Sequence, residues 1–276
     1  MSTQDVSQFQ LITEQAIRQA GQLLVERMGQ FTAREKSPKD LVTDVDMAAQ
    51  RMIEEQLKSA FPTHAFLGEE DDGQQADSRS LPAGESWIAS QEYCWIVDPI
   101  DGTTNYVHQV PFFSVSIALW HYGQPLCGMV LDPLRDELFS ASTGQGVTLN
   151  GQAISVSATE ELQQSLVAVS FPPQIENEAL EVRRFQQALR RCQAVRRMGS
   201  AALNLSYLAA GRLDGYWASS VQPWDVAAGI LFVREAGGMV TAIDGGEFQI
   251  ERPILLASAS EVLQGSLLEL LSGCES

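Results

Sequence analysis

The chain has 276 residues, of which 45% are hydrophobic and 8% aromatic, enough to bury a sizeable core. Its 35 acidic and 18 basic residues give a formal net charge of −17, which repels nucleic-acid backbones and anionic membranes. We therefore expect no nucleic-acid partner and no membrane partner. The four cysteines lack CxxC spacing, three histidines are too few for a zinc-finger pattern, and no signal-like start or long apolar run occurs. These features predict a reduced, cytoplasmic protein.

Positive charge is concentrated in one region. Six arginines form three adjacent pairs between residues 183 and 197, in "VRRFQQALRRC" and "VRRMG". Arginine pairs on a helix usually form a solvated face. We interpret them as surface residues and keep the expectation that nucleic acid is not a partner.

The chain opens with two amphipathic patterns. Apolar residues recur at helical spacing within residues 9–28 and again within 47–57, which predicts two helices. The segment between them is dense in charge and contains Pro38, so we expect a break in regular structure there. Thr43 or Asp44 can cap the second helix.

The next region changes from polar to β-prone sequence. Residues 71–92 are rich in Gly, Ser and Asp and predict a long exposed loop, either a lid over a divalent cation or a surface insertion. The apolar run "CWIVD" then predicts a strand. Residues 112–156 contain short β-prone runs separated by turn signals, which predicts an antiparallel meander.

The remainder alternates strand and helix patterns. Strands are predicted for "SLVAVSF", "MVTAI" and "ILLASA", and helices for "EALEVRRFQQALRRC", "WDVAAGILFVREAGG" and "SEVLQGSLLELLSG". The segment "SAALNLSYLAAGRLDGYW" predicts a helix that runs into a strand. A boundary near residue 155 would separate a helix-and-meander half, residues 1–155, from an α/β half, residues 156–276.

Acidic residues fall where several predicted elements begin or end. Taken singly, Glu69 can be a solvated residue, and Asp225 can be a helix cap. Asp98 and Asp101 differ, because they flank a rigid Pro-Ile at the end of a buried strand. Two carboxylates held that close repel each other unless a cation or a shared proton intervenes. A hard-cation site accounts for the pair directly.

A magnesium site would also explain the residues that follow. Mg²⁺ prefers oxygen ligands and keeps substrate phosphates among them, and two ions can share a bridging carboxylate. The turn at Gly102, Thr103 and Thr104 can open a short helix whose backbone N–H groups point at a phosphate. The stretch thus combines cation ligands with phosphate donors.

The segments "GEE", "DPIDGTTNYVHQVPFFSVSIAL" and "WDVAAG", in that order, closely resemble the inositol monophosphatase family, which is related to fructose-1,6-bisphosphatase. The resemblance covers nearly the whole chain, from the amphipathic start through "SPKDLVTDVD" to "EAGG". It implies an α/β (α+β) protein built as a layered α-β-α-β-α sandwich and assembled as a homodimer. It also implies lithium-sensitive phosphatase activity that depends on two or three Mg²⁺ ions.

The resemblance also implies roles for individual residues. The first metal would be bound by Glu69, Asp98 and the Ile100 carbonyl, and the second by Asp98, Asp101 and Asp225. A third, weaker ion is expected near Glu69. Most of these ligands lie in residues 1–155, whereas Asp225 and the substrate-side residues lie in 156–276.

Catalysis in the family uses a metal-activated water and no covalent enzyme intermediate. The resemblance implies that Thr103 and Asp46 position and deprotonate this water, with Asp46 as the base. It implies that Glu69 is a further catalytic residue. His108 and His121 are then unnecessary for the chemistry, and we interpret them as structural or surface residues. The expected substrate-binding residues are Gly102, Thr103, Asp101, Gly199, Ser200, Ala201 and Asp225.

The chain departs from the family pattern at one position. Inositol-hydrolysing members have a Glu that hydrogen-bonds inositol hydroxyls seven residues before the Asp of "WDVAAG", where this chain has Ala218. Ser219, Ser220 or Gln222 would have to replace it. Trp217 is interpreted as a core residue, with stacking on a sugar or aromatic leaving group as the alternative.

These features and the resemblance predict a Mg²⁺-dependent phosphatase that acts on a small phosphomonoester, and the resemblance implies inositol 1-phosphate as the default substrate. The alternative substrates within the class are fructose 1,6-bisphosphate, histidinol phosphate and a 3'-phosphonucleotide. They are favoured by the presence of Ala218 where inositol-hydrolysing members have Glu. A second hypothesis is a non-catalytic regulatory protein of the same fold. The intact ligand set disfavours it. A kinase is set aside because no GxxxxGK[ST] or GxGxxG is present.

Overall fold

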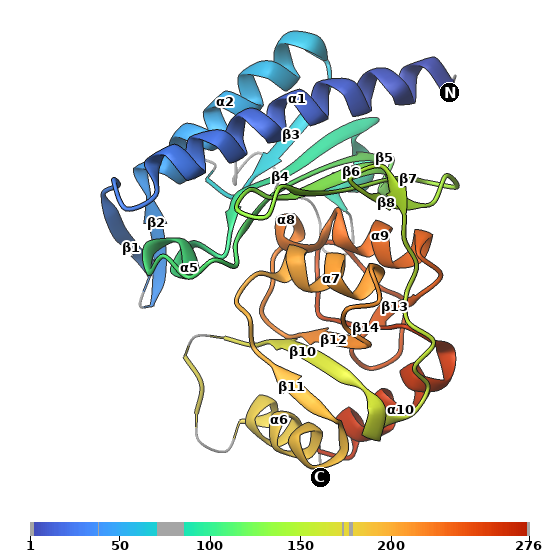
Figure 1. Cartoon of the computed structure of the whole chain (residues 1–276). Coiled ribbons are helices and arrows are strands. Elements are labelled where there is room, and N and C mark those ends of the chain that lie inside the picture. Colours follow the sequence, from blue (N-terminus) through green and yellow to red (C-terminus); the bar gives the residue numbers. More distant parts are fainter. Residues whose placement is uncertain (1–2, 38, 71–85, 173, 177–178, 275–276) are drawn as a thin grey trace.

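The computed structural model describes residues 3–37, 39–70, 86–172, 174–176 and 179–274. Its helices and sheets are stacked in α-β-α-β-α order, with the N-terminal helices at the top of Figure 1 and the C-terminal helix near the bottom. The predicted layered sandwich is therefore confirmed. Of the described helices, none is long and apolar enough to cross a membrane.

The first layer consists of α1 (Thr3–Arg27) and α2 (Asp44–Ala60), which pack on each other and on one face of the first sheet. Both predicted helices are thus present. The Thr43 side chain caps α2 by accepting the backbone N–H of Asp46, whose carboxylate in turn accepts the N–H of Thr43. This reciprocal cap fixes Asp46 in the first turn of α2.

The second layer is a seven-stranded sheet in the order β3-β4-β5-β6-β7-β8-β9. Its strands β4 to β9 form an antiparallel meander, as predicted, and β3 adds to β4 in parallel. The strands are β3 (Ala65–Gly68), β4 (Tyr93–Asp101), β5 (Ser114–His121), β6 (Gln124–Asp132), β7 (Glu137–Ser142), β8 (Val147–Leu149) and β9 (Gln152–Ala153).

The third layer lies between the two sheets and comprises three short helices, α7 (Ala201–Ala209), α8 (Pro223–Val226) and α9 (Gly229–Glu235). A single helix was predicted for the last two. Instead the chain turns at residues 227–228. The interruption accompanies a close approach of α9 to α7, since a Cβ added to Gly229 would lie 2.5 Å from the Leu205 Cβ.

The fourth layer is a five-stranded sheet in the order β11-β10-β12-β14-β13. Strand β10 runs parallel to β11 and β12, and β14 runs antiparallel to β12 and β13. Its strands are β10 (Leu166–Ser170), β11 (Ala194–Arg196), β12 (Gly215–Ala218), β13 (Met239–Ala242) and β14 (Leu255–Ser258). The chain changes sheet near the expected boundary, but a division into two domains stays a prediction.

The fifth layer contains α6 (Leu180–Arg191) and α10 (Glu261–Ser272), which cover the outer face of the second sheet. Separate apolar cores fill the spaces between layers. Trp217 is 1% exposed and belongs to the core under α6 and α10, which confirms its structural interpretation. The four cysteines are buried, and none of them forms a disulfide bond.

Several short elements were not predicted. A hairpin of β1 (Ala33–Ser37) and β2 (Asp40–Thr43) occupies the segment expected to be a break, and a 3₁₀ turn, η1 (Leu162–Gln164), precedes β10. The expected loop over residues 71–92 lies outside the described residues up to residue 85 and then forms α4 (Trp87–Ser90). The predicted short helix after Gly102 is present as α5 (Thr103–Val107).

Candidate active site

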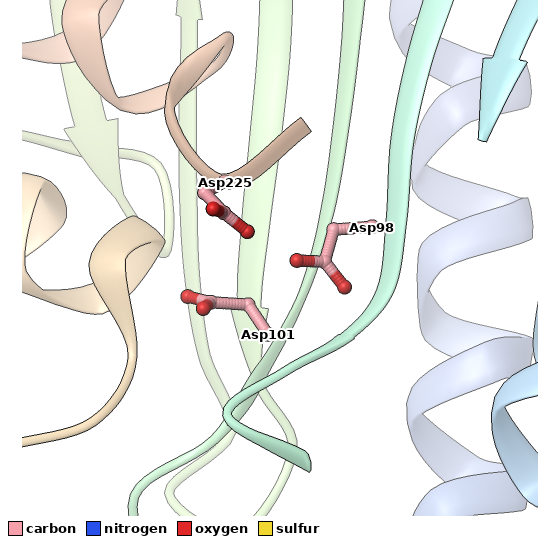
Figure 2. Close-up of side chains that lie close together, drawn as sticks. All are labelled: Asp98, Asp101 and Asp225. Atoms are coloured by element: carbon pink, nitrogen blue, oxygen red, sulfur yellow. The ribbon is translucent and has the colours of Figure 1, made fainter. Parts of the chain in front are cut away.

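Asp98 and Asp101 lie on one side of β4 although they are three residues apart. In a regular strand such residues point to opposite faces. Here the pairing with β5 is irregular between Asp98, which is opposite Ser116, and Asp101, which is opposite Ser114. The irregularity turns both carboxylates toward the same space, as Figure 2 shows.

Asp225 joins this pair from α8. A Pro at the first helical turn and a reciprocal cap between Gln222 and Asp225 start that helix, and the Asp225 carboxylate points at Asp98 and Asp101 (Figure 2). Carboxylate oxygens of the three residues lie within 4.8 Å of one another. Three acidic groups from two distant segments thus form one cluster.

Each carboxylate is oriented by local hydrogen bonds. The backbone N–H of Ile100 donates to Asp98 Oδ1 at 3.0 Å, and that of Gln222 donates to Asp225 Oδ2 at 2.6 Å. Asp101 accepts the Ser200 hydroxyl and two N–H groups at the start of α7, at 3.1 and 2.7 Å. The positions of the acidic groups are therefore fixed before any ligand binds.

Burial and mutual repulsion disfavour the charged form of this cluster. Burial raises the pKa of Asp98 and of Asp225 well above the usual value, and neighbouring carboxylates raise both further. The pKa of Asp101 is raised to about 6, also by burial, which outweighs its hydrogen bonds from Ser200, Ala201 and Ala202. A divalent cation would relieve the repulsion, so the donor set fits a hard metal ion.

Glu69 lies beside the cluster at the end of β3. Its backbone N–H donates to the Val97 carbonyl at 3.1 Å, which places it next to β4. Burial raises the pKa of Glu69. The Lys36 ammonium of β1 lies 3.1 Å from Glu69 Oε1 and also contacts Glu70. Burial lowers the pKa of Lys36, but the two glutamates outweigh it and raise the pKa overall.

Thr103 connects the cluster with Asp46. Its hydroxyl lies 3.0 Å from the Ile100 carbonyl and 3.3 Å from Asp46 Oδ1, so it can donate to either acceptor. Asp46 is fully buried, and burial raises its pKa to about 6. Gly102 begins α5 with a φ of 101°, and a Cβ there would lie 3.1 Å from the Gly199 carbonyl oxygen.

A cleft of about 860 Å³ opens beside the carboxylates. Gly199 and Ala201, two of the predicted substrate-binding residues, line it, whereas Ser200 is fully buried behind Asp101 and caps α7. The remaining lining residues are Lys36, Lys39, Glu69, Asp101, Thr104, Asn105, Ser170, Phe171, Arg197, Met198, Ser220, Val221, Gln222, Trp224 and Asp225.

Sequence reasoning missed several of these residues. Lys36 was assigned only to the predicted break in regular structure between the first two helices, and Arg197 only to a solvated face. Asn105 was not singled out, yet its Nδ2 donates to the carbonyls of Phe112 and Met198, both at 2.7 Å. The contact with Met198 joins segments far apart in the chain, so no local pattern reveals it.

The histidines lie outside the acidic cluster. His108 is exposed at the end of α5, and His121 contacts Tyr93 in a tilted arrangement with ring centroids 4.8 Å apart. Both positions agree with the structural or surface interpretation.

The fold and site together define a layered α/β protein with an acidic centre suited to a divalent cation and an adjoining cleft for a small ligand. Residues 5–276 match the inositol monophosphatase family. The chain is 38% identical over 262 residues to Nus factor SuhB of Pseudomonas aeruginosa, covering 93% of each chain. It is 36% identical to the inositol-1-monophosphatase of Mesorhizobium japonicum, covering 92% of each.

Solved structures agree with these sequence matches. The extragenic suppressor protein suhB from Bartonella henselae superposes with a TM-score of 0.85 at 36% identity, covering 95% of this chain and 98% of that one. The inositol monophosphatase from Anabaena superposes with a TM-score of 0.81 at 36% identity, covering 98% and 97%. The chain therefore belongs to the inositol monophosphatase family, as its motifs indicated.

Proposed function

We propose that the protein is a Mg²⁺-dependent phosphomonoesterase. The observation that carries this proposal is the convergence of Asp98, Asp101 and Asp225 within 4.8 Å, beside a cleft of about 860 Å³. Membership of a phosphatase family supports the same reaction class. Inositol 1-phosphate is the first substrate to test.

The metal ligands proposed here are Glu69, Asp98, the Ile100 carbonyl, Asp101 and Asp225. When bound, Mg²⁺ would neutralise phosphoryl charge and make a nearby water a better nucleophile. Two or three ions are expected from the family. Asp98 faces Asp101 and Asp225 (Figure 2) and also interacts electrostatically with Glu69, so it would contribute to holding more than one ion.

Residues of the chain would orient the water, accept its proton and bind the phosphate. The Thr103 hydroxyl, 3.3 Å from Asp46 Oδ1, can orient a water and pass its proton toward Asp46. A carboxylate with a pKa of about 6 is ionised near neutral pH and can still accept a proton during the reaction. We assign the phosphate to the backbone N–H groups of Gly102 and Thr103, where α5 begins.

Phosphate release from a panel of phosphomonoesters, with and without millimolar Mg²⁺, tests the proposal. Asp98→Asn should lower Mg²⁺-dependent kcat/KM by about 100-fold or more, because it removes a central charge without changing side-chain size. The matched control is Asp136→Asn, a residue whose side chain is 84% exposed and lies outside the cleft. If wild type releases no phosphate from any ester, the proposal is wrong.

A regulatory role is the second candidate, because relatives that are 36 and 38% identical are named Nus factor SuhB. The two candidates differ in whether function needs Asp98. A regulatory function would survive Asp98→Asn, provided that the variant stays folded, whereas a catalytic one would not. Family membership further leads us to propose a homodimer inhibited by Li⁺, which light scattering and the same phosphate assay can test.

A further inference from the structure

A second cavity, of about 470 Å³, lies away from the acidic centre. It is bordered by Ser86 before α4, Trp120 in β5, residues 123–125 where β6 begins, Arg234 in the last turn of α9, and residues 247–252 between β13 and β14. Of the described residues, none lines both this cavity and the cleft beside the carboxylates. The cavity is therefore separate from the candidate active site.

The cavity lies toward the far end of β5 from the acidic centre. In the pairing with β4, Ser116 is opposite Asp98, whereas Trp120 is opposite Cys94. At about 3.3 Å per residue, the strand covers about 13 Å between Ser116 and Trp120. A ligand in this cavity would therefore leave the carboxylate cluster free to bind its own ligands.

Two donors at the cavity wall lack an acceptor. Trp120 is 3% exposed, and its Nε1 has no hydrogen-bond partner among the described residues. A buried N–H without a partner costs free energy. Trp120 lines this cavity, unlike Trp95 and Trp217, whose buried N–H groups are also unpartnered. A ligand seated there can supply the missing acceptor.

The second donor is the Arg234 guanidinium. Within the described part of the chain, no carboxylate lies close enough to Arg234 to form an ion pair. Burial lowers the pKa of Arg234, and Glu247 raises it by less. The guanidinium thus has lost water without gaining a paired anion. Its planar fork of N–H donors matches the two oxygens of a carboxylate.

The remaining wall indicates the charge and the body of the ligand. The charges of Arg234 and Arg252 are balanced by those of Glu247 and Glu251. In a chain with a formal net charge of −17, such a neutral wall favours a singly charged anion over a dianion. Phe248 adds an aromatic ring to the wall, and the volume suits a small organic molecule.

We propose that this cavity is a second binding site, which takes a small monocarboxylate with an apolar or aromatic body. The carboxylate accepts hydrogen bonds from the Arg234 guanidinium and the Trp120 indole, and the body packs against Phe248. Binding there needs neither a metal ion nor turnover. The inference therefore goes beyond the proposed phosphatase function and does not depend on it.

Nuclear magnetic resonance of the Trp120 indole N–H tests the proposal in the full chain. The resonance is assigned by its loss in Trp120→Phe. The probes are 3-phenylpropionate, indole-3-acetate and hexanoate. At least one should shift the resonance with a Kd of about 1 mM or tighter. The uncharged 3-phenylpropionamide should bind about 10-fold or more weakly than 3-phenylpropionate. Benzylphosphonate, a dianion above neutral pH, should also bind more weakly.

Variants show which residues hold the carboxylate. Arg234→Gln should weaken carboxylate binding by about 10-fold and leave the amide unaffected, whereas Arg234→Lys should restore part of the affinity because it keeps the charge. Arg190→Gln makes the same charge change on α6, outside the cavity, and should match wild type. Asp98→Asn alters only the acidic centre and should also match wild type. Thermal denaturation checks that each variant is folded.

Several results would overturn the inference. One is that no carboxylate shifts the Trp120 resonance at about 10 mM. Another is that the amide or the phosphonate binds as tightly as the carboxylate, or that Arg234→Gln and Arg190→Gln behave alike. Loss of binding in Asp98→Asn would place the ligand at the acidic centre instead. Because no step measures phosphate release, failure of the phosphatase proposal would leave this result unchanged.

Discussion

At the scale of single residues, Thr103 occupies the position on which the proposed proton transfer would depend. Its hydroxyl is within reach of two acceptors, the Ile100 carbonyl and the Asp46 carboxylate. The first belongs to the proposed metal site and the second to the capped start of α2. Thr103 thus joins the proposed metal site to the buried carboxylate of Asp46.

Thr103→Val tests this connection. Removing the hydroxyl at nearly constant volume should lower kcat by about 100-fold, because water loses its path to Asp46, while KM changes little. Thr103→Ser keeps the hydroxyl and should retain most activity. Steady-state kinetics and thermal denaturation are measured together. Equal losses for Val and Ser, or a large drop in thermal stability for Val, would assign Thr103 a packing role.

The residue scale also shows what could be predicted from the sequence. Asp98 and Asp101 were identifiable because a rigid Pro-Ile at a strand end leaves two carboxylates little room to diverge. Their meeting with Asp225 was expected only from the family resemblance, since no local pattern joins β4 to α8. The exposure of Arg197 was predicted, but its stacking on Phe171 was not, because that contact depends on the adjacency of β10 and β11.

At the scale of elements, the periodic segments were predicted and the charged β1–β2 hairpin was not. The helices α1 and α2 follow from apolar spacing, and the meander follows from its turns. The β1–β2 hairpin has the strand sequence "AREKS", which lacks apolar alternation, so only tertiary pairing reveals it. That hairpin brings Lys36 to Glu69, and the contact was therefore missed as well.

The close packing of α7 on α9 gives a prediction at this scale. Gly229→Ala should destabilise the protein by about 1 to 3 kcal/mol, because the new Cβ would lie 2.5 Å from the Leu205 Cβ. Gly265→Ala is the matched control in α10, where a Cβ meets nothing within 4 Å. That exchange should stabilise the fold by up to about 1 kcal/mol through helix propensity. Urea denaturation measures both, and equal effects would contradict the packing argument.

At the scale of the whole molecule, the acidic centre destabilises the metal-free folded state. The pKa of Asp101 is raised to about 6 by burial, above its value in an unfolded chain. A raised carboxyl pKa contributes stability that is complete below the unfolded pKa and is lost as pH rises through the folded pKa. The metal-free protein should therefore become less stable between about pH 4 and pH 6 to 7.

Magnesium should reverse this loss. We expect millimolar Mg²⁺ to raise the Tm by several degrees near pH 7.5 and by less near pH 5, where protons compete for the same oxygens. Thermal denaturation in chelator and in Mg²⁺ at both pH values measures the effect. Asp98→Asn should abolish the Mg²⁺ shift, and a shift that persists in this variant would place the ion elsewhere.

The three clustered aspartates belong to different layers, since Asp98 and Asp101 end a strand of the first sheet and Asp225 starts a helix between the sheets. An ion held by all three would link the first sheet to the helix layer between the sheets. Because coupling between binding and conformation is reciprocal, an ion that binds only when α8 is docked would stabilise that docking, and undocking of α8 would lower the affinity for the ion. The measured affinity for the cation would therefore also report how stably α8 is docked against the first sheet.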